Sequence, residues 1–471
     1  MSPRGGTRPR VLIAGGGVAA LEALLALRSL ASGHLELALL TADRFFVYRP
    51  VTVGEAFDRS HARSFAIASI AADQGAELVP DSLVHVDAAG HRVVTGSGAE
   101  VEFDHLVIAT GARSRGALPG ALTFHGRDDV PALRNLLQEL VSGQARSVAL
   151  ALPSQTSWPL PLYELALMAA AHLRDHGSET AVTLVTPEEE PLELFGPAAS
   201  RAVEGLLAAR GVTLRTSSLP AMVRRRALVL AGGGVVFADR VITLPLAEGP
   251  AVPGVPHDRH GFIAVDRHGR VSGLEGVYAA GDVTAFPLKQ GGLAAQQADA
   301  VAESIAAEVG VPITPQPFRP VLRGLLLTGG APMYLRAEPQ RLPREASVAI
   351  EAHLAPHPGR DASAAAGQPL WWPPAKIAGR YLAPYLATAR PQPLSGELLV
   401  DKAPVPGAPL SESEHRDALE LSLMMAGMDA KWGDYRSALE ALDAAEALEG
   451  ALPPEYEIKR REWQAAERTN T

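Results

Sequence analysis

Cysteine is absent from this chain of 471 residues. Its absence excludes disulfides, thiolate nucleophiles, and metal or iron–sulfur sites with cysteine ligands, and we predict no metal site. Positive charge is not in excess either: the formal net charge is −9, so charge does not suggest a nucleic-acid partner. No stretch approaches the roughly 18 to 20 consecutive apolar residues that a membrane-spanning helix needs.

The N-terminal segment also lacks the features of a secretory signal. The segment MSPRGGTRPR is basic but has no separate apolar core or small-residue cleavage site. We therefore expect a cytoplasmic protein. The length favours about three domains, and the 47% of apolar residues can supply more than one core.

A glycine loop stands near the start of the chain. An apolar run from Val11 stops at Gly15-Gly16-Gly17, and a helical pattern follows at once. This order is typical of a strand, turn and helix that hold a pyrophosphate: Gly15 permits the turn, Gly17 lets the backbone approach the phosphates, and Ala20 is the small residue where helix packs on strand. The helix N-terminus favours an anion. By itself, the motif also fits a glycine-rich turn of another α/β protein.

Two further strands extend this unit. Residues 35–40 form a second predicted strand, as expected in a parallel sheet. Asp43, just beyond it, is the candidate for the adenosine ribose hydroxyls, with a solvated turn as the alternative. A buried strand at Leu106–Ala109 ends in Thr110-Gly111.

A second α/β pattern begins at Ser147. It predicts strands at 147–152 and 181–186 with a helix between them, a helix through Leu206, and strands near Val229 and Val241. A strand pattern returns at 261–266, and a helix is expected from about Gly292 to Val309. The proline-rich segment 311–320 marks a domain boundary, a strand is expected in LRGLLLTG after it, and residues 354–370 are expected to form a loop.

A second signature lies at Tyr278–Asp282, where a strand ends in AAGD. With the first glycine loop and the ATGAR segment, it resembles the two-domain flavoproteins of the pyridine nucleotide-disulfide oxidoreductase superfamily. The resemblance implies FAD as the cofactor. It implies that the cofactor contacts come from Gly15, Gly17, Thr110, Gly111, Gly281 and Asp282.

Within that superfamily, the chain most resembles sulfide:quinone oxidoreductases and flavocytochrome c sulfide dehydrogenases. The segment 281–297, GDVTAFPLKQGGLAAQQ, carries part of the likeness. The resemblance implies that Lys289 and the amides near Gly291 and Gly292 lie at the pyrimidine edge of the flavin, where a cation and a helix N-terminus stabilise negative charge. The alternative for Lys289 is a surface lysine.

The segment 152–167, LPSQTSWPLPLYELAL, carries the rest of the likeness. A user of NAD(P)H would have a second glycine loop here, but prolines fill this turn and no glycine stands between Gly143 and Gly177. Proline removes the amide donors that a pyrophosphate needs. In the resembling enzymes a cysteine precedes the proline, whereas this chain has Trp158, which excludes cysteine sulfur chemistry. We expect Trp158 and Tyr163 to form a wall of the catalytic site near Lys289. The alternative is that Trp158 is a core residue.

Two C-terminal regions carry further expectations. The segment 369–387 gathers Trp, Tyr, Lys376 and Arg380 around prolines, which suits peripheral contact with a membrane, packing over the flavin domain, or a homodimer contact. In the tail, Gly433, Tyr435, Ala438, Leu442 and Ala445 have the spacing of a tetratricopeptide helix pair. Such a pair packs on its own domain or on a neighbouring subunit, or docks a protein redox partner.

We therefore predict an α/β fold with two dinucleotide-binding, Rossmann-like, three-layer domains, a C-terminal region and a helical tail. The expected boundaries are 1–120 and 256–315 for the FAD-binding domain, 121–255 for the second domain, 316–410 for the C-terminal region and 411–471 for the tail. The predicted function is an FAD-dependent oxidoreductase that passes electrons from a small-molecule donor to a quinone-like or protein acceptor. The alternatives are an NAD(P)H dehydrogenase related to type II NADH dehydrogenases, and a non-catalytic FAD-binding sensor or scaffold.

Overall fold

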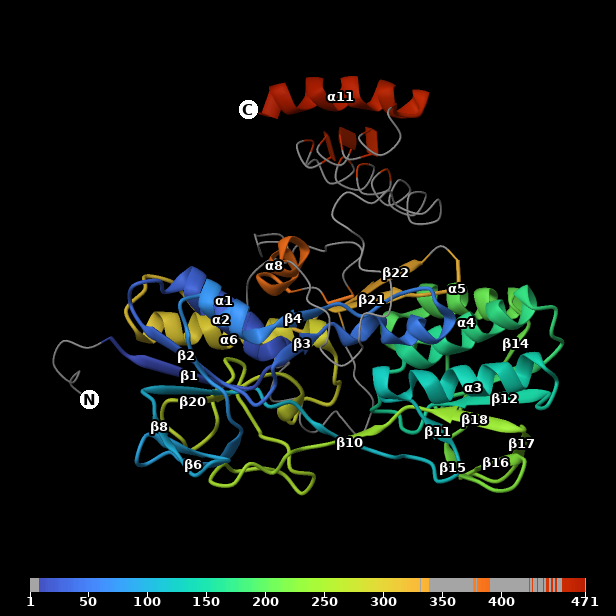
Figure 1. Cartoon of the computed structure of the whole chain (residues 1–471), viewed down its shortest axis with the longest axis horizontal. Coiled ribbons are helices and arrows are strands. Elements are labelled where there is room, and N and C mark those ends of the chain that lie inside the picture. Colours follow the sequence, from blue (N-terminus) through green and yellow to red (C-terminus); the bar gives the residue numbers. More distant parts are fainter. Residues whose placement is uncertain are drawn as a thin grey trace, which may run out of the picture. The chain divides into compact units, whose positions relative to one another are not determined.

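The computed structural model of the chain describes residues 8–330, 332–338, 376–377, 379–389 and 451–470, together with single positions between 423 and 446. The chain divides into two compact units, Met1–Leu394 and Ser395–Thr471. Figure 1 labels the helices and strands along the chain.

The first sheet of the larger unit is parallel and has the strand order β20-β9-β1-β2-β5. Its strands are β1 (Arg10–Ala14), β2 (Glu36–Leu40), β5 (Glu77–Val79), β9 (His105–Ile108) and β20 (Val277–Ala279). The chain thus returns to its first sheet after building the second one. This return brings the AAGD segment beside the ATGAR segment.

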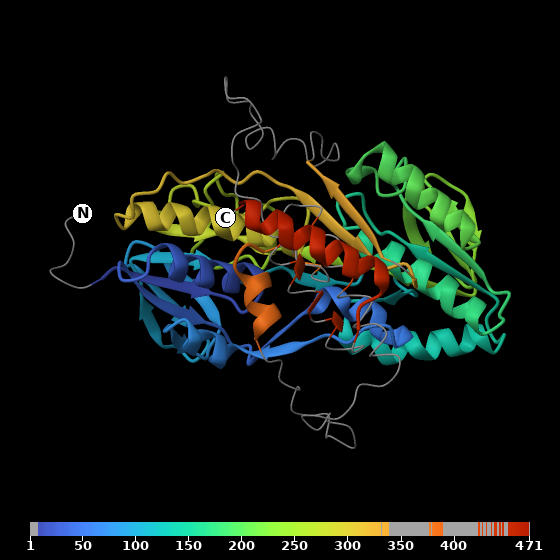
Figure 2. The ribbon, with the colours of Figure 1, turned by 90° about the horizontal axis from the view of Figure 1, so that it is seen from above.

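Two layers cover this sheet. Helices α1 (Val18–Leu30) and α6 (Gly291–Glu308) lie side by side on one face (Figure 2). A small antiparallel sheet of β6 (Leu83–Asp87), β7 (Arg92–Thr95) and β8 (Glu100–Glu102) packs on the other. Every residue of α1 from Ala19 to Leu27 is buried, so the helix is apolar on nearly all sides rather than along one stripe.

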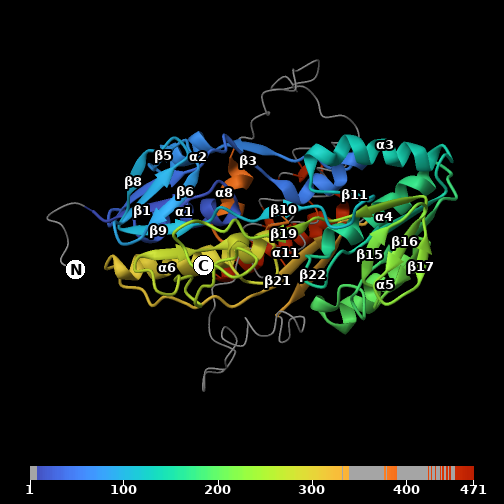
Figure 3. The same cartoon turned by 90° about the horizontal axis from the view of Figure 1, so that it is seen from below.

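The second sheet is also parallel, with the strand order β11-β18-β12-β13-β14. Its strands are β11 (Leu122–Thr123), β12 (Ser147–Ala151), β13 (Ala181–Val185), β14 (Val212–Arg215) and β18 (Arg240–Thr243). Helices α3 (Val130–Val141) and α4 (Leu160–Asp175) contribute to the core on one face, with α5 (Pro197–Ala209) beside β14. Strands β15 (Pro220–Val223), β16 (Ala227–Leu230) and β17 (Val235–Phe237) contribute to the core on the other (Figure 3).

These two three-layer arrangements confirm the predicted fold class. Connecting elements join them: β3 (Phe45–Val47) pairs with β4 (Ser64–Ala66), and β10 (Arg113–Arg115) pairs with β19 (Leu246–Glu248). The 3-10 helix η1 (Arg49–Phe57) follows β3 and packs against α3 and α4 beside the second sheet. Helix α2 (Ile67–Asp73) follows β4.

The strand expected at 261–266 is wrong. Only isolated bridges form there, from Ile263 to Thr284 and from Val265 to Val271. Gly261 adopts a positive φ of 81°, and its carbonyl lies too close to Gly249 for a side chain at either position. This close crossing bends the segment and prevents a continuous strand.

After α6, the strands β21 (Leu322–Leu326) and β22 (Met333–Ala337) form a hairpin, and α8 (Leu382–Thr388) follows. The expected loop at 354–370 lies outside the described residues. Among the helices in the described ranges, none has the length and apolar character required to span a bilayer.

The smaller unit contains α11 (Pro454–Asn470) and a core of its own. Ala438, Leu442 and Ala445 are fully buried there with Trp463, and Tyr435 is partly buried against them. Gly433 lies outside the described residues. The helical tail is therefore present as expected, whereas the five domain boundaries stay predictions.

Candidate functional site

The glycine loop between β1 and α1 is shaped by a close backbone approach. Gly15 has a φ of 139°, and a Cβ on it would lie 2.2 Å from the carbonyl oxygen of Ala109. The Gly15 amide donates to the Leu40 carbonyl at 2.8 Å. Glycine is therefore required at this position by the fold itself, because β9 passes directly beneath the turn.

Gly17 differs from Gly15, because nothing lies within 4 Å of where its Cβ would be. It is the N-cap of α1, and no side chain caps the helix there. The free first-turn amides and the open space beside Gly17 fit an anionic group such as a pyrophosphate. Ala20 is fully buried, in agreement with its predicted packing role.

The residues predicted to surround this loop lie on neighbouring strand ends. Asp43 is exposed, and its carboxylate would lie 3.0 Å from a Cβ on Gly16, so it borders the loop. Thr110 is exposed at the end of β9, and Gly111 has a φ of 74° with open space around it. These placements fit FAD, and the individual contacts stay predictions.

The second signature forms a tight turn against α1. Gly281 has a φ of 80°, and a Cβ on it would lie 2.9 Å from that of Ala19. Its amide donates to Gln297 Oε1 at 2.7 Å, and Thr284 Oγ1 lies 3.4 Å from the same oxygen. Gln297 of α6 thus fixes the turn that carries Asp282.

Two cations act on Asp282. Burial raises the pKa of Asp282, while Lys289 and Arg49 lower it. Arg49 was not among the predicted site residues. It precedes Pro50 at the start of η1, and a single arginine there gives no motif that sequence analysis could use.

Lys289 lies in the loop before α6. Its Nζ donates to the carbonyls of Thr284 at 2.5 Å and Phe286 at 2.7 Å, and lies 3.9 Å from the ring centroid of Phe262. Burial lowers the pKa of Lys289 to about 8, against the opposing effects of Asp282 and Asp258. Lys289 is therefore a partly buried cation rather than the surface lysine of the alternative.

The N-terminus of α6 is partly capped by its own sequence. Gln290 Oε1 accepts from the Leu293 amide at 2.9 Å, and its Nε2 donates to the Arg323 carbonyl at 2.8 Å. Gly292 is buried beneath the Gln290 side chain. The Leu293 amide of the helix is thus already bonded. A flavin contact with the amides near Gly291 and Gly292 stays a prediction.

The proline-rich turn after β12 is packed with apolar groups. Trp158 is half-buried and meets Phe195 edge-on, with ring centroids 5.9 Å apart. Leu160 is 4% exposed, and Gly324 of β21 leaves no room between it and Phe195: a Cβ there would lie 3.0 Å from Phe195 and 3.3 Å from Leu160. Trp158 is therefore partly buried against the core, as in the alternative that it is a core residue.

Tyr163 is fully buried in α4. Its hydroxyl donates to Glu188 Oε2 at 2.6 Å, and Thr186 donates to the same oxygen at 2.8 Å. Burial raises the pKa of Tyr163 well above 10 and that of Glu188 to about 7. A side chain enclosed in this way does not line a wall open to substrate, so the expected role of Tyr163 in catalysis is not supported by its position.

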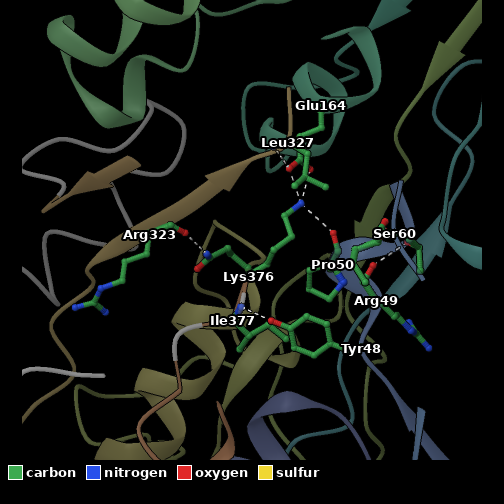
Figure 4. A network of polar contacts seen from close by, with 12 residues as sticks. Tyr48, Arg49, Pro50, Ser60, Glu164, Arg323, Leu327, Lys376 and Ile377 are labelled. Carbon is green, nitrogen blue, oxygen red and sulfur yellow. Dashed lines mark hydrogen bonds and ion pairs between the residues drawn. The ribbon is translucent and has the colours of Figure 1, made fainter. Parts of the chain in front are cut away.

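Glu164, next to Tyr163, forms a buried ion pair with Lys376 (Figure 4). Lys376 Nζ lies 2.5 and 2.6 Å from the two carboxylate oxygens and donates to the Pro50 carbonyl at 2.9 Å. The Leu327 amide donates to Glu164 at 2.9 Å. The pair therefore ties the C-terminal segment to η1, α4 and the end of β21.

Glu22 receives the same C-terminal segment on α1. Its carboxylate accepts from the amides of Tyr381 at 2.8 Å and Leu382 at 2.7 Å. Asp299 of α6 lies beside it, and burial raises the pKa of both carboxyl groups. Two buried carboxyl groups side by side disfavour ionisation of both at once.

The described residues of the segment 369–387 pack against other parts of the larger unit. Lys376 is buried in its ion pair, and α8 buries Leu382 and Leu386 against α1. Packing over the flavin domain, one of the three expectations, is what the described part of this segment shows. Trp371 and Trp372 lie outside the described residues.

The pairing of Glu164 with Lys376 and the role of Glu22 were not predicted from the sequence. Each of the two acids interrupts an apolar helical run, VAALEALLAL and LYELAL. An acid on a buried face must be paired, so this interruption is a usable signal. The identity of the partner, 212 residues away for Glu164, carries no local signal.

Two parallel sheets, one with an open glycine loop and both with helices and a small antiparallel layer, define a two-domain dinucleotide-binding oxidoreductase. The family described as pyridine nucleotide-disulphide oxidoreductase matches residues 9–149 and 165–303, more than half of the chain. The chain belongs to this family. The match is interrupted at the proline-rich turn.

Individual relatives have different named activities. An NADH dehydrogenase-like protein of Mycobacterium tuberculosis is 30% identical over 227 residues, which are 45% of this chain and 56% of that protein. The chain thus spans little more than half the length of this relative. A sulfide-quinone reductase of Aquifex aeolicus is 24% identical over 368 residues, 71% of this chain and 85% of that protein.

The X-ray structure of the sulfide:quinone oxidoreductase from Aquifex aeolicus has a TM-score of 0.65 and 23% identity, covering 71% of this chain and 85% of that one. This likeness shows the fold. The family match makes the chain a member of a family of FAD-binding oxidoreductases, and the differently named relatives do not fix a donor or an acceptor.

Exchanges of the two loop glycines separate folding from cofactor binding. G15A is expected to lower the free energy of unfolding by roughly 2–3 kcal/mol, because its Cβ meets the Ala109 carbonyl at a strained φ. The Cβ of G17A enters open space, so this exchange is expected to change the free energy of unfolding by less than about 0.5 kcal/mol. It is nevertheless expected to lower the affinity for FAD at least ~10-fold. Urea unfolding of the apo-protein and FAD titration measure the two effects. Unchanged FAD affinity in G17A would contradict the predicted pyrophosphate site.

The pKa of Lys289 predicts a pH dependence of stability. Since about 8 lies below the ordinary 10.5, the unfolded chain binds more protons between these values, and the free energy of unfolding rises with pH there. Relative to K289M, the wild type should gain on the order of 1–2 kcal/mol between pH about 7.5 and 9.5. Urea unfolding of both proteins at each pH gives this difference. Parallel pH profiles would show that Lys289 is not buried as described.

Proposed function

We propose that this protein takes electrons from a small-molecule donor other than NAD(P)H and passes them through FAD to a quinone-like acceptor. The observation that carries the proposal is the filled turn between β12 and α4. Pro153 and Pro159 are buried in it, and Leu160, Trp158 and Phe195 pack where a second pyrophosphate would approach. Pro153, Pro159 and Pro161 have no amide hydrogen, and apolar side chains pack at the start of the helix, so this turn offers a pyrophosphate fewer donors than a glycine loop does.

A second observation supports the exclusion of a pyridine nucleotide. In a dinucleotide-binding domain, an acid after the second strand holds the ribose hydroxyls. Glu188, after β13, is 5% exposed and bonded to Tyr163 and Thr186. Glu188 Oε2 therefore already accepts two hydrogen bonds within the domain, in place of bonds from ribose hydroxyls.

FAD, when bound, supplies two-electron chemistry and needs orientation and charge stabilisation from the protein. In this proposal Gly17 and the N-terminus of α1 hold the pyrophosphate, and Asp43 holds the ribose. Lys289 and the N-terminus of α6 stabilise negative charge at the flavin edge. With no cysteine in the chain, the donor is oxidised without a protein thiol.

The quinone-like acceptor is supported by the sulfide-quinone reductase likeness, which extends over most of that relative. An NAD(P)H dehydrogenase is the second candidate, favoured by the 30% identity to a protein named NADH dehydrogenase-like. Peripheral membrane contact, a homodimer, and a protein acceptor on the tail unit are further proposals.

Anaerobic mixing tests the choice of donor. The holo-protein reduced with dithionite is expected to regain its visible flavin absorbance on mixing with a quinone, whereas NADH or NADPH is expected to bleach the oxidised holo-protein at least ~100-fold more slowly than dithionite does. Dithionite serves as the control, because it reduces any competent flavin. Reduction by NADH within one second, as fast as typical turnover, would replace this proposal with the second candidate.

A further inference from the structure

The C-terminal clamp, the described residues of 376–389, follows the family match by more than seventy residues. It nevertheless contacts elements on both sides of the flavin site. Its first residue reaches α4 and η1, and its helix α8 packs on α1. The clamp therefore lies outside the matched family region.

Lys376 anchors the clamp at the second sheet. All three ammonium donors have acceptors: two Glu164 oxygens and the Pro50 carbonyl. The side chains of Lys376 and Glu164 are 4% and 0% exposed. Removal of one member of such a pair leaves an uncompensated buried charge, so each partner requires the other to stay in place.

The middle of the clamp lies against the start of α6. The Ile377 amide donates to the Tyr48 hydroxyl at 2.7 Å, as Figure 4 shows. The Ile377 side chain is 3% exposed, and a Cβ on Gly291 would lie 3.1 Å from it. Gly291 is part of the helix end predicted to face the flavin.

Glu22 anchors the other end of the clamp on α1. It accepts the amides of Tyr381 and Leu382, and a Cβ on Gly379 would lie 2.5 Å from its carboxylate. Farther along, the Tyr385 hydroxyl donates to Asp73 at 2.6 Å. The clamp therefore contacts helix α1, which follows the glycine loop, through Glu22 and the packing of α8.

Two of the anchors lie on elements that bear predicted FAD contacts: Glu22 on α1, and the contact of Ile377 with Gly291 on α6. We propose that the C-terminal clamp retains FAD by fixing α1, η1, the start of α6 and α4 against one another, with Lys376 as its positioning residue. Because opening of any one of these walls requires the clamp to leave, the rate of FAD release reports whether it is docked. The inference rests on FAD binding and is independent of the donor and acceptor.

Two variants release opposite ends of the clamp. K376M removes the cation from Glu164, and G379V places a side chain against Glu22 without touching the ion pair. Both are expected to speed FAD release from the purified holo-protein at least tenfold, followed by the fluorescence of released FAD after dilution. K376R keeps a cation beside Glu164 and is expected to stay within threefold of the wild type.

A matched control separates clamp release from general destabilisation. T243V removes a fully buried hydroxyl that donates to the Ala151 carbonyl at 2.8 Å, away from the clamp. It is expected to lower thermal stability while FAD release stays within twofold of the wild type. Limited proteolysis within 376–389 verifies that the clamp is free in the two test variants.

The proposal is overturned if K376M and G379V free the clamp and still release FAD at the wild-type rate. It is equally overturned if T243V releases FAD as fast as they do. If K376M does not fold, G379V alone decides, since its ion pair is intact. None of these measurements uses an electron donor or acceptor, so the proposed function can fail without affecting them.

Discussion

The packing at the start of α4 is the contact on which the rest of the proposed chemistry depends. Leu160 and Phe195 close on Gly324 of β21, and Pro153 and Pro159 before the helix have no amide hydrogen. The second sheet therefore keeps the architecture of a dinucleotide-binding domain while its pyrophosphate turn is filled. The first sheet keeps an open turn at Gly17. This asymmetry separates the site that holds FAD from the domain beside it.

Two buried carboxylates, Glu164 and Glu22, bind the C-terminal segment to helices of the two sheets. Glu164 and Glu22 both sit in helices that are otherwise apolar, and each binds the same C-terminal segment. Burial of an acid costs free energy unless it is paired, so these contacts fix one arrangement of the chain rather than adding much net stability. Gln297 has a comparable role at the Gly281 turn, where its side-chain oxygen holds the backbone that presents Asp282.

Local patterns predicted the parts of the fold that depend on local spacing. The glycine loop, both parallel sheets and α6 follow from apolar runs broken by glycine. The expected site wall of Trp158 and Tyr163 is not supported by their packing. Trp158 meets Phe195 and Tyr163 bonds to Glu188, and both partners come from a later turn of the chain that no local pattern links to them. The strand expected at 261–266 failed because Gly249 crosses it closely, a contact that no periodicity encodes. Lys376 lies 212 residues from Glu164, so no local pattern in the sequence joins the two residues.

The central claim is that the second domain does not hold a pyridine nucleotide. Its most direct test is equilibrium titration of the purified, FAD-loaded protein with NADH and NADPH by calorimetry in the absence of any acceptor. The account predicts no saturable heat up to millimolar nucleotide, since three prolines remove amide donors from the β12–α4 turn and apolar side chains pack at the start of α4. Saturable binding of either nucleotide in the micromolar range would contradict it.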